Sequence, residues 1–328
     1  MTLSELLRRS PVDLYLVLLM LTVAVAAVIP ARGVGADILA WVVYAAIATL
    51  FVLYGARLSP QAIWAGLSNW RLQGVIAITT YVVFPLVGLA IAWAAGPLLQ
   101  PDLVAGLLFI SVLPSTVQSS IAFTSIARGN VAASICAASL SNLLGVVLTP
   151  LLVSLLMGAT GVGFSLEALK DIALQILLPF GVGQLLRPFV GEWLNRHKTL
   201  TRMVDRGSIL IVVYSAFSAG MVAGIWSRVS VTDLLVVLVF GLVLLGIIIV
   251  GTTIASRALG FNTADEISIV FCGSKKSMAT GIPMATILFA GHAVGLIVLP
   301  LMLFHQAQLF VCAVLARRYA RRPEGGGA

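Results

Sequence analysis

Charged residues are scarce in this chain. Only 10% of its 328 residues are Asp, Glu, Lys or Arg, whereas a soluble domain carries roughly 25%. Hydrophobic residues make up 60% of the chain, and the mean hydropathy is +1.09. These values exclude an ordinary soluble domain and predict an integral membrane protein. Because the apolar runs are long and uniform, we expect helices and not the alternating strands, about 10 residues long, of a β-barrel.

Reactive and metal-binding patterns are also missing. The three cysteines and three histidines are scattered and include no C-x-x-C pair, so a metal site of these residues has no support. No phosphate-binding glycine loop, nucleophile elbow or pair of carboxylates is present, and we therefore do not expect an enzyme. The net charge of +8 comes mostly from short loops between apolar segments. That is where membrane proteins concentrate Lys and Arg, so the expected partner is the lipid bilayer and not nucleic acid.

Ten hydrophobic segments follow one another along the chain. The first, from Val12 to Ile29, is longer than the apolar part of a signal peptide, which has about 7–15 residues, and we interpret it as a transmembrane helix. The segments predict an all-α protein of ten transmembrane helices, over 12–29, 37–55, 72–95, 103–126, 131–156, 172–186, 208–225, 234–255, 266–290 and 294–316.

The basic residues give this protein an orientation. With a cytoplasmic N-terminus, fifteen Lys and Arg residues fall on the cytoplasmic side, and only Arg32, Lys170 and Arg228 fall outside. Cytoplasmic loops are enriched in Lys and Arg. The sequence therefore predicts a multi-pass protein of the inner membrane with both termini in the cytoplasm.

The ten segments divide evenly at a polar patch that contains Glu167, Lys170 and Asp171. Five helices on each side would insert with opposite orientations, as in the inverted repeats of many transporters. We expect a single transmembrane domain over 1–328, with repeats over 12–156 and 172–316 and a cytoplasmic tail over 317–328. The fourth segment of each half carries helix-breaking and polar residues, which is typical of a transporter's binding site.

The break in the first half begins at Pro114. Hydroxyl and amide oxygens, together with carbonyls released by the break, suit a small cation or a polar substrate. Hydrogen bonding between helices is the alternative role. The polar residues concerned are Ser115, Thr116, Gln118, Ser119 and Ser120.

Three further polar residues lie in the neighbouring and last segments. Ser139 and Asn142 share a helix face because they are three positions apart, and a short connection places their segment beside the first break. His305, in the last segment, could contact a substrate or bond a neighbouring helix. For Ser139, Asn142 and His305 the sequence leaves open whether the side chain binds a ligand or only bonds a neighbouring helix.

The break in the second half contains two adjacent lysines, Lys275 and Lys276. A charge near the bilayer centre costs at least about 2.5–3.5 kcal/mol, so such residues normally face a partner or a water-filled cavity. Acidic residues, which could pair with the lysines, lie only near segment ends. This favours a lysine that binds an anionic substrate or one that takes the place of a bound cation. At most one lysine can point directly at a given site unless the helix is broken. The same stretch holds Ser274, Ser277 and Thr280.

Three stretches carry a resemblance to a known family. They are STVQSSIAFTSIARGNVAAS, FCGSKKSMATGIPMA and LPLMLFHQAQLFVCAVLARRYARR. The chain resembles the bile acid:sodium symporter superfamily, and within it the bacterial and vertebrate branch related to sodium/bile acid cotransporter 7. The resemblance implies two inverted repeats, with helices four and nine unwound and crossing, and a core domain that moves against a panel domain.

The resemblance also bears on ions. Ser119, Ser120, Ser139 and Asn142 correspond by position to a sodium site of the superfamily, and sodium is the only cofactor it implies. The helix-nine glutamate, glutamine and asparagine of that family match Phe271, Lys275 and Lys276 here. Because the lysines repel a bound cation, we hypothesise that an ammonium replaces one sodium ion. Coupling would then be to fewer sodium ions, to protons or to none.

The sequence therefore predicts a symporter-like, alternating-access secondary active transporter of a small organic anion. Two alternatives stay open at this stage, an ion-independent facilitator and a non-transporting membrane sensor or regulatory protein. The sequence names neither the substrate nor the oligomeric state.

Overall fold

The computed structural model describes residues 14–57, 69–157, 173–224 and 229–322, and within these ranges the regular structure is helical throughout. The predicted polar patch at Glu167–Asp171 lies outside them. The helices are α2 (Leu14–Val28), α3 (Val34–Arg57), α5 (Trp70–Ile78), η1 (Thr79–Val83, a π-helical turn), α6 (Phe84–Ala95), α7 (Pro101–Val112), α8 (Val117–Ile126), α9 (Val131–Met157), η3 (Ala173–Leu177), α11 (Leu178–Arg196), α12 (Lys198–Val222), α13 (Val231–Ala258), α14 (Thr263–Gly273), α15 (Met278–Leu288) and α16 (Val294–Ala320).

Six helical spans within the described ranges are long and apolar enough to cross a membrane. A seventh is added when α7 and α8, which meet at a bend of 60°, are counted as one broken span. Each of the ten predicted segments coincides with a helix or a broken helix pair. Ten crossing helices in two inverted repeats remain a prediction.

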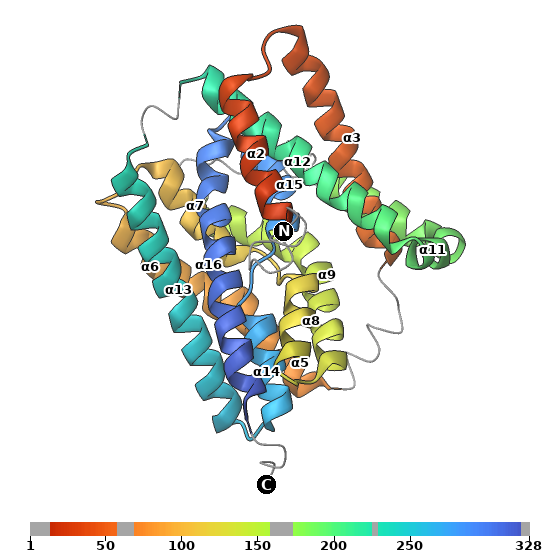
Figure 1. Ribbon diagram of the computed structural model, residues 1–328, viewed down its shortest axis with the longest axis vertical. Coiled ribbons are helices and arrows are strands. Elements are labelled where there is room, and N and C mark those ends of the chain that lie inside the picture. The colour runs from red at the N-terminus through yellow and green to blue at the C-terminus, as the bar shows by residue number, and fades with distance from the viewer. Residues whose placement is uncertain (1–13, 58–68, 158–172, 225–228, 323–328) are drawn as a thin grey trace, which may run out of the picture.

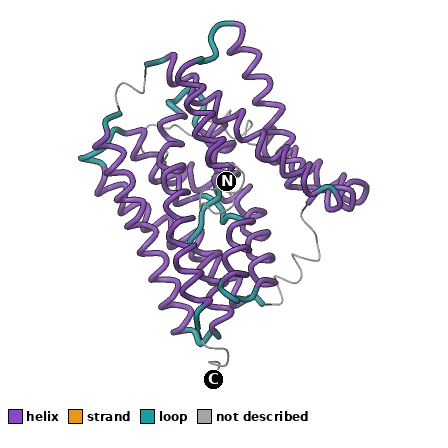
Figure 2. The backbone as a smooth tube through the Cα atoms, viewed as in Figure 1, coloured by secondary structure: helices purple, strands orange, loops and turns teal. Residues whose placement is uncertain are grey.

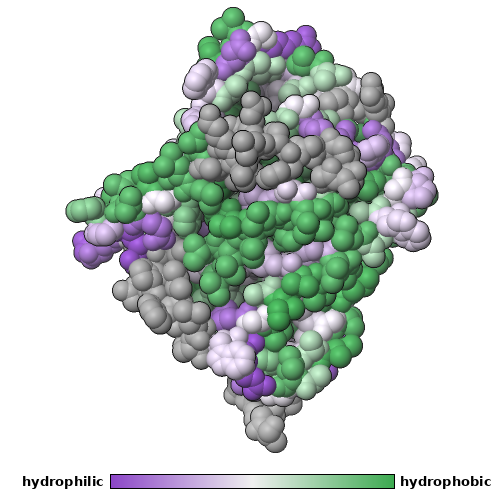
Figure 3. Space-filling view, turned by 180° about the vertical axis from the view of Figure 1, so that it is seen from behind, coloured by the Kyte–Doolittle hydropathy of each residue, from purple (hydrophilic) through white to green (hydrophobic). Residues whose placement is uncertain are grey.

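The outer surface is suited to lipid. Large apolar side chains such as Trp93, Leu155 and Phe189 are 75–85% exposed. Figure 3 shows a face that is largely hydrophobic, with hydrophilic residues gathered toward its margins. Exposed apolar surface on this scale marks a membrane or interaction surface, and together with the apolar helices it identifies a multi-pass membrane protein.

Four helices, α2, α3, α11 and α12, form one group, which we call the panel helices (Figure 1). α3 and α11 touch through their backbones, because a Cβ atom on Gly55 would collide with the carbonyl of Phe180 and one on Gly183 with that of Val52. Glycine is required wherever two backbones approach so closely. α12 packs against α2 and α3 on one side and against α15 and α16 on the other.

The remaining helices, α5 to α9 and α13 to α16, form the second group, the core helices. Their interior is filled by aromatic pairs between helices, Phe84 with Phe304 at 6.4 Å between ring centroids and Phe109 with Phe289 at 5.1 Å. All four rings are buried. Edge-on pairs of this kind add to the energy of apolar burial, so they hold one half of each broken helix, α7 and α15, against its neighbours.

Residues 187–206 lie between the predicted segments 172–186 and 208–225, and their hydrophilic composition predicts the longest loop of the chain; this prediction is wrong. α11 continues to Arg196, and α12 begins at Lys198. Charged and apolar residues alternate here with helical spacing, so the stretch forms amphipathic helix ends. A hydropathy window averages this alternation to a low value, which made the segment resemble a loop.

Both predicted breaks are present. α7 ends at Val112 and α8 begins at Val117, with Leu113 extended at ψ 155°. Proline forces the preceding residue out of the helical region, so Pro114 ends α7. The second break separates α14, which ends at Gly273, from α15, which begins at Met278. Figure 2 shows loop segments in the middle of the helical body as well as at its ends.

Candidate functional site

The two breaks cross each other and are joined by hydrogen bonds. The hydroxyls of Ser115 and Ser120 donate to the carbonyls of Cys272 and Phe271, at 2.6 and 3.0 Å. Thr116 Oγ1 donates to the Lys276 carbonyl at 2.9 Å, and the Ser277 N–H donates to the Pro114 carbonyl at 2.8 Å. A helix end leaves carbonyls without intrahelical donors, and each break supplies donors to the other.

Asn142 of α9 connects both breaks. Its Nδ2 donates to the Ser115 carbonyl at 2.8 Å, and its Oδ1 accepts from Thr280 Oγ1 at 3.0 Å. Thr280 also bonds Ser277, which caps the N-terminus of α15 by accepting from the Thr280 N–H. The predicted closeness of Asn142 to the break is therefore present in the structure.

A cavity of about 310 Å³ lies between the panel helices and the crossing. It is large enough for a small organic molecule, since ligand pockets typically measure about 300–1,000 Å³. Its polar lining on the core side consists of predicted site residues, namely Thr116, Gln118, Ser119, Ser139, Asn142, Ser277, Thr280 and His305.

Two helices begin at this cavity. α8 starts at Val117 and α15 at Met278, and both first residues line it together with Thr116 and Ser277. The N-terminus of a helix carries unpaired N–H groups and about half a positive charge. The helix ends therefore place partial positive charge on the core side of the cavity, where the described lining residues include no Lys or Arg.

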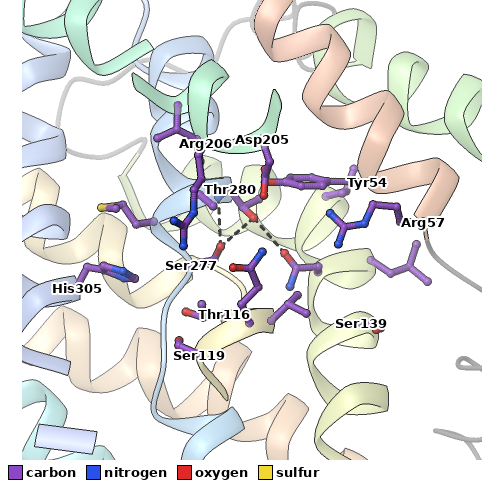
Figure 4. Close-up of a pocket in the computed structure, with 18 of the residues that line it drawn as sticks. Tyr54, Arg57, Thr116, Ser119, Ser139, Asp205, Arg206, Ser277, Thr280 and His305 are labelled. Atoms are coloured by element: carbon purple, nitrogen blue, oxygen red, sulfur yellow. Dashed lines mark hydrogen bonds between the residues drawn. The ribbon is translucent and has the colours of Figure 1, made fainter. Parts of the chain in front are cut away.

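The panel side supplies arginines, which the sequence analysis did not assign to the site. Arg57 of α3 and Arg206 of α12 line the cavity, and in Figure 4 both extend toward Ser277 and Thr116. Asp205 is buried, and its carboxylate accepts from the Tyr54 hydroxyl at 3.0 Å. Both arginines had been counted only as charges that set orientation, and no local motif distinguishes them from the other loop arginines.

The five remaining predicted residues, Ser115, Ser120, Ser274, Lys275 and Lys276, lie buried at the crossing and do not line the cavity. Lys276 Nζ donates to the carbonyls of Thr80, Ser111 and Leu113. Lys275 Nζ lies over the Phe123 ring at 3.8 Å from its centroid. Neither ammonium points at the space where a substrate would bind.

The residues of the implied sodium site do not form one ligand set. Ser119, Ser139 and Asn142 line the cavity, whereas Ser120 is fully buried and bonds across the crossing. The Asn142 Oδ1 already accepts from Thr280. The arrangement does not fit a sodium ion held by these four residues.

Comparison with known proteins gives consistent matches over nearly the whole chain. The model of the SBF-like CPA transporter family matches residues 13–321. An uncharacterized protein of Pseudomonas aeruginosa is 54% identical over 96% of this chain and 95% of its own length. The Escherichia coli protein named "Putative symporter YfeH" is 51% identical over 95% and 94%. Sodium/bile acid cotransporter 7 of Mus musculus is 30% identical over 95% and 93%.

Proposed function

The chain belongs to the SBF-like CPA transporter family, as its resemblance to the bile acid:sodium symporters predicted, and we propose that it is a secondary active carrier of a small organic anion. The observation that carries the proposal is the cavity between the panel helices and the crossing. Its two sides present different positive groups, helix N-termini from the core and arginines from the panel.

An anion is the ligand that these groups suit. Helix N-termini bind carboxylate and phosphate groups through free N–H donors, and arginine binds the same groups through paired donors. Among the described residues of the lining, Asp205 is the one acid; its bond from Tyr54 holds it to the panel side, where it interacts electrostatically with Arg57 and Arg206. The arginines and the N-termini of α8 and α15 therefore outweigh it.

An organic anion is favoured over an inorganic one by the apolar part of the lining. Leu143, Val146, Phe180, Ile209 and Leu309 face the same cavity. Apolar walls with a few placed polar groups are typical of small-molecule sites. A carbon skeleton would displace water from these side chains, which stabilises binding by about 25 cal/mol per Å² of apolar surface buried.

The division into two helix groups supports an alternating-access mechanism. We propose that the cavity opens to one side of the membrane at a time as the core helices move against the panel helices. The corresponding breaks in α7–α8 and α14–α15 support two inverted repeats, over 12–156 and 172–316, in a ten-helix domain. We further propose that the protein lies in the inner membrane with both termini in the cytoplasm. Arg57, which lines the cavity at the end of α3, then supports a cavity that is open toward the cytoplasm, because cytoplasmic ends are enriched in arginine.

The test is uptake by purified protein in proteoliposomes. Benzoate, 2-oxobutyrate and succinate are first compared for their effect on the thermal unfolding midpoint, with choline as a cationic control. The radiolabelled form of a stabilising anion is then offered to vesicles under imposed ion gradients. Stabilisation without uptake under any gradient contradicts the carrier function.

Two arginine variants test the site. Arg57→Gln and Arg206→Gln each remove a charged donor, and hydrogen bonds to charged groups contribute about 1.5–3 kcal/mol. We expect the half-saturating anion concentration to rise about tenfold or more, because 1.4 kcal/mol corresponds to a factor of ten. Arg196→Gln, which alters an exposed pair with Glu192, is the matched control and should leave it unchanged. Equal values for all three variants contradict the assignment.

A further inference from the structure

The ammonium of Lys276 is held as a metal cation would be held. It is fully buried, and its three N–H groups donate to three backbone carbonyls, those of Thr80 at 2.9 Å, Ser111 at 2.8 Å and Leu113 at 2.8 Å. The ring of Phe84 lies 4.0 Å from Nζ. Within the described part of the chain, no carboxylate pairs with this ammonium.

The three carbonyls are available because of local irregularities in the helices. Ser111 and Leu113 lie at the end of α7, where the break removes the next turn and its N–H donors. Thr80 lies in the π-helical turn η1. The end of a helix carries about half a negative charge, and unwound carbonyls at such ends bind Na⁺ in transporters.

The backbone of Lys276 is fixed as firmly as its side chain. Its N–H donates to Gln308 Oε1 at 2.9 Å, and its carbonyl accepts from Gln308 Nε2 at 3.0 Å. The same Gln308 Nε2 lies 2.9 Å from His305 Nδ1, which is part of the cavity lining. We call the carbonyls of Thr80, Ser111 and Leu113 the carbonyl cage. Lys276 connects this cage to the cavity lining, because its ammonium fills the cage and its backbone bonds Gln308, which contacts His305.

We propose that Lys276 is a tethered cation, which permanently fills the carbonyl cage at the end of α7 that would otherwise take a monovalent cation. The second break is then held against α7 and η1 without an ion from solution. The consequence for transport rests on the proposed carrier function: anion movement needs no cation bound in the carbonyl cage. The occupancy of the cage itself can be measured without any substrate.

Lys275 provides a matched comparison. It is adjacent, equally buried and of equal size, but its Nζ has no hydrogen-bond partner among the described residues and lies against the faces of Phe123 and Phe271. Removing this ammonium exposes no carbonyl cage. A difference between variants at the two positions therefore reports on the cage and not on the loss of a buried lysine in general.

The experiment measures the thermal unfolding midpoint of detergent-purified Lys276→Ala and Lys275→Ala in sodium, potassium, methylammonium and choline chloride at equal ionic strength. A ligand that binds only the folded state raises its stability by mass action. We expect the midpoint of Lys276→Ala to rise in sodium or methylammonium relative to choline, because a free cation can enter the vacated cage. The wild type and Lys275→Ala should have the same midpoint in all four salts.

Two results overturn the proposal. One is a midpoint of Lys276→Ala that is the same in all four salts. The other is a sodium-specific rise in the wild type that Lys276→Ala abolishes. If Lys276→Ala cannot be purified in any salt, Lys276→Met and Lys275→Met are compared, because methionine keeps about the volume of the lysine side chain but removes the ammonium. We expect the Lys276→Met midpoint to be the lower of the two, and equal midpoints overturn the proposal.

Uptake separates this inference from the carrier function. In proteoliposomes, wild-type uptake of the stabilising anion should not depend on sodium, whereas Lys276→Ala should gain a dependence on it. An absence of uptake in both proteins contradicts the carrier function. The salt dependence of the unfolding midpoints then still tests whether Lys276 fills the carbonyl cage. A third outcome is that the midpoint of Lys276→Ala depends on sodium and that uptake by the wild type depends on sodium as well. The coupling ion would then bind at another site. This outcome overturns only the statement that anion movement needs no cation, and not the assignment of Lys276 to the carbonyl cage.

Discussion

The hydrogen bond from Ser115 to Cys272 offers a sharp test of how the crossing is held. Ser115 is fully buried, and its Oγ donates to the Cys272 carbonyl at 2.6 Å. The N–H four residues on, that of Lys276, donates to Gln308 and so does not serve this carbonyl. Ser115→Ala removes the donor with almost no change in volume, which leaves a buried carbonyl without its partner.

The size of the stability loss depends on which buried group Ser115→Ala leaves without a hydrogen-bond partner. A buried acceptor without a partner costs about 1–3 kcal/mol, although side-chain hydrogen bonds in membrane proteins average only about 0.6 kcal/mol with a maximum near 1.7. Because the Cys272 carbonyl ends a helix, we expect about 1–2 kcal/mol of destabilisation for Ser115→Ala. Adding Ser120→Ala, which removes the donor to the Phe271 carbonyl, should bring the loss to about 2–4 kcal/mol.

The assay is reversible unfolding in mixed micelles of increasing SDS fraction, followed by tryptophan fluorescence. Ser119→Ala is the matched control, because Ser119 lies in the first turn of α8 beside Ser120 but its Oγ has no hydrogen-bond partner among the described residues. We expect that control to be at least as stable as the wild type, because it removes a buried hydroxyl that makes no hydrogen bond. A Ser115→Ala variant as stable as Ser119→Ala would refute the reasoning, since the carbonyl would then have an alternative donor.

Two further predictions concern other parts of the fold. Glu266 accepts hydrogen bonds from Arg257 at 2.8 and 3.0 Å and from Tyr319 at 2.7 Å. Glu266→Gln should therefore lower the free energy of unfolding by about 1–2 kcal/mol, which is more than Tyr319→Phe should lower it. The same SDS titration compares the two variants, and a smaller loss of stability for Glu266→Gln than for Tyr319→Phe contradicts the prediction. Gly55→Leu should destabilise by at least about 1–3 kcal/mol because its side chain collides with the backbone of α11. Gly181→Leu has open space around its Cβ and is the control, and equal thermal midpoints for the two would exclude close packing as the cause.

Much of the candidate site could be predicted from single residues. Pro114 dictates where α7 ends, and the hydroxyl and amide groups that follow it indicated a polar site at the break. The crossing of the two breaks was implied only by the family resemblance. Asn142 was connected to the break by helix periodicity together with the short connection between its segment and the preceding one. Arg57 and Arg206 could not be found this way, because each resembles an ordinary loop arginine until α3 and α12 pack beside the core helices.

The sequence by itself determined that this is a helical membrane protein with two interrupted helices, because composition, hydropathy and proline act locally. It also placed two lysines at the second break. Only the tertiary structure decided that neither lysine faces the cavity and that Lys276 reaches carbonyls of Thr80, Ser111 and Leu113 instead. Those carbonyls lie more than 160 residues away in the sequence, and no local property of the chain indicates which helix end a buried ammonium will meet.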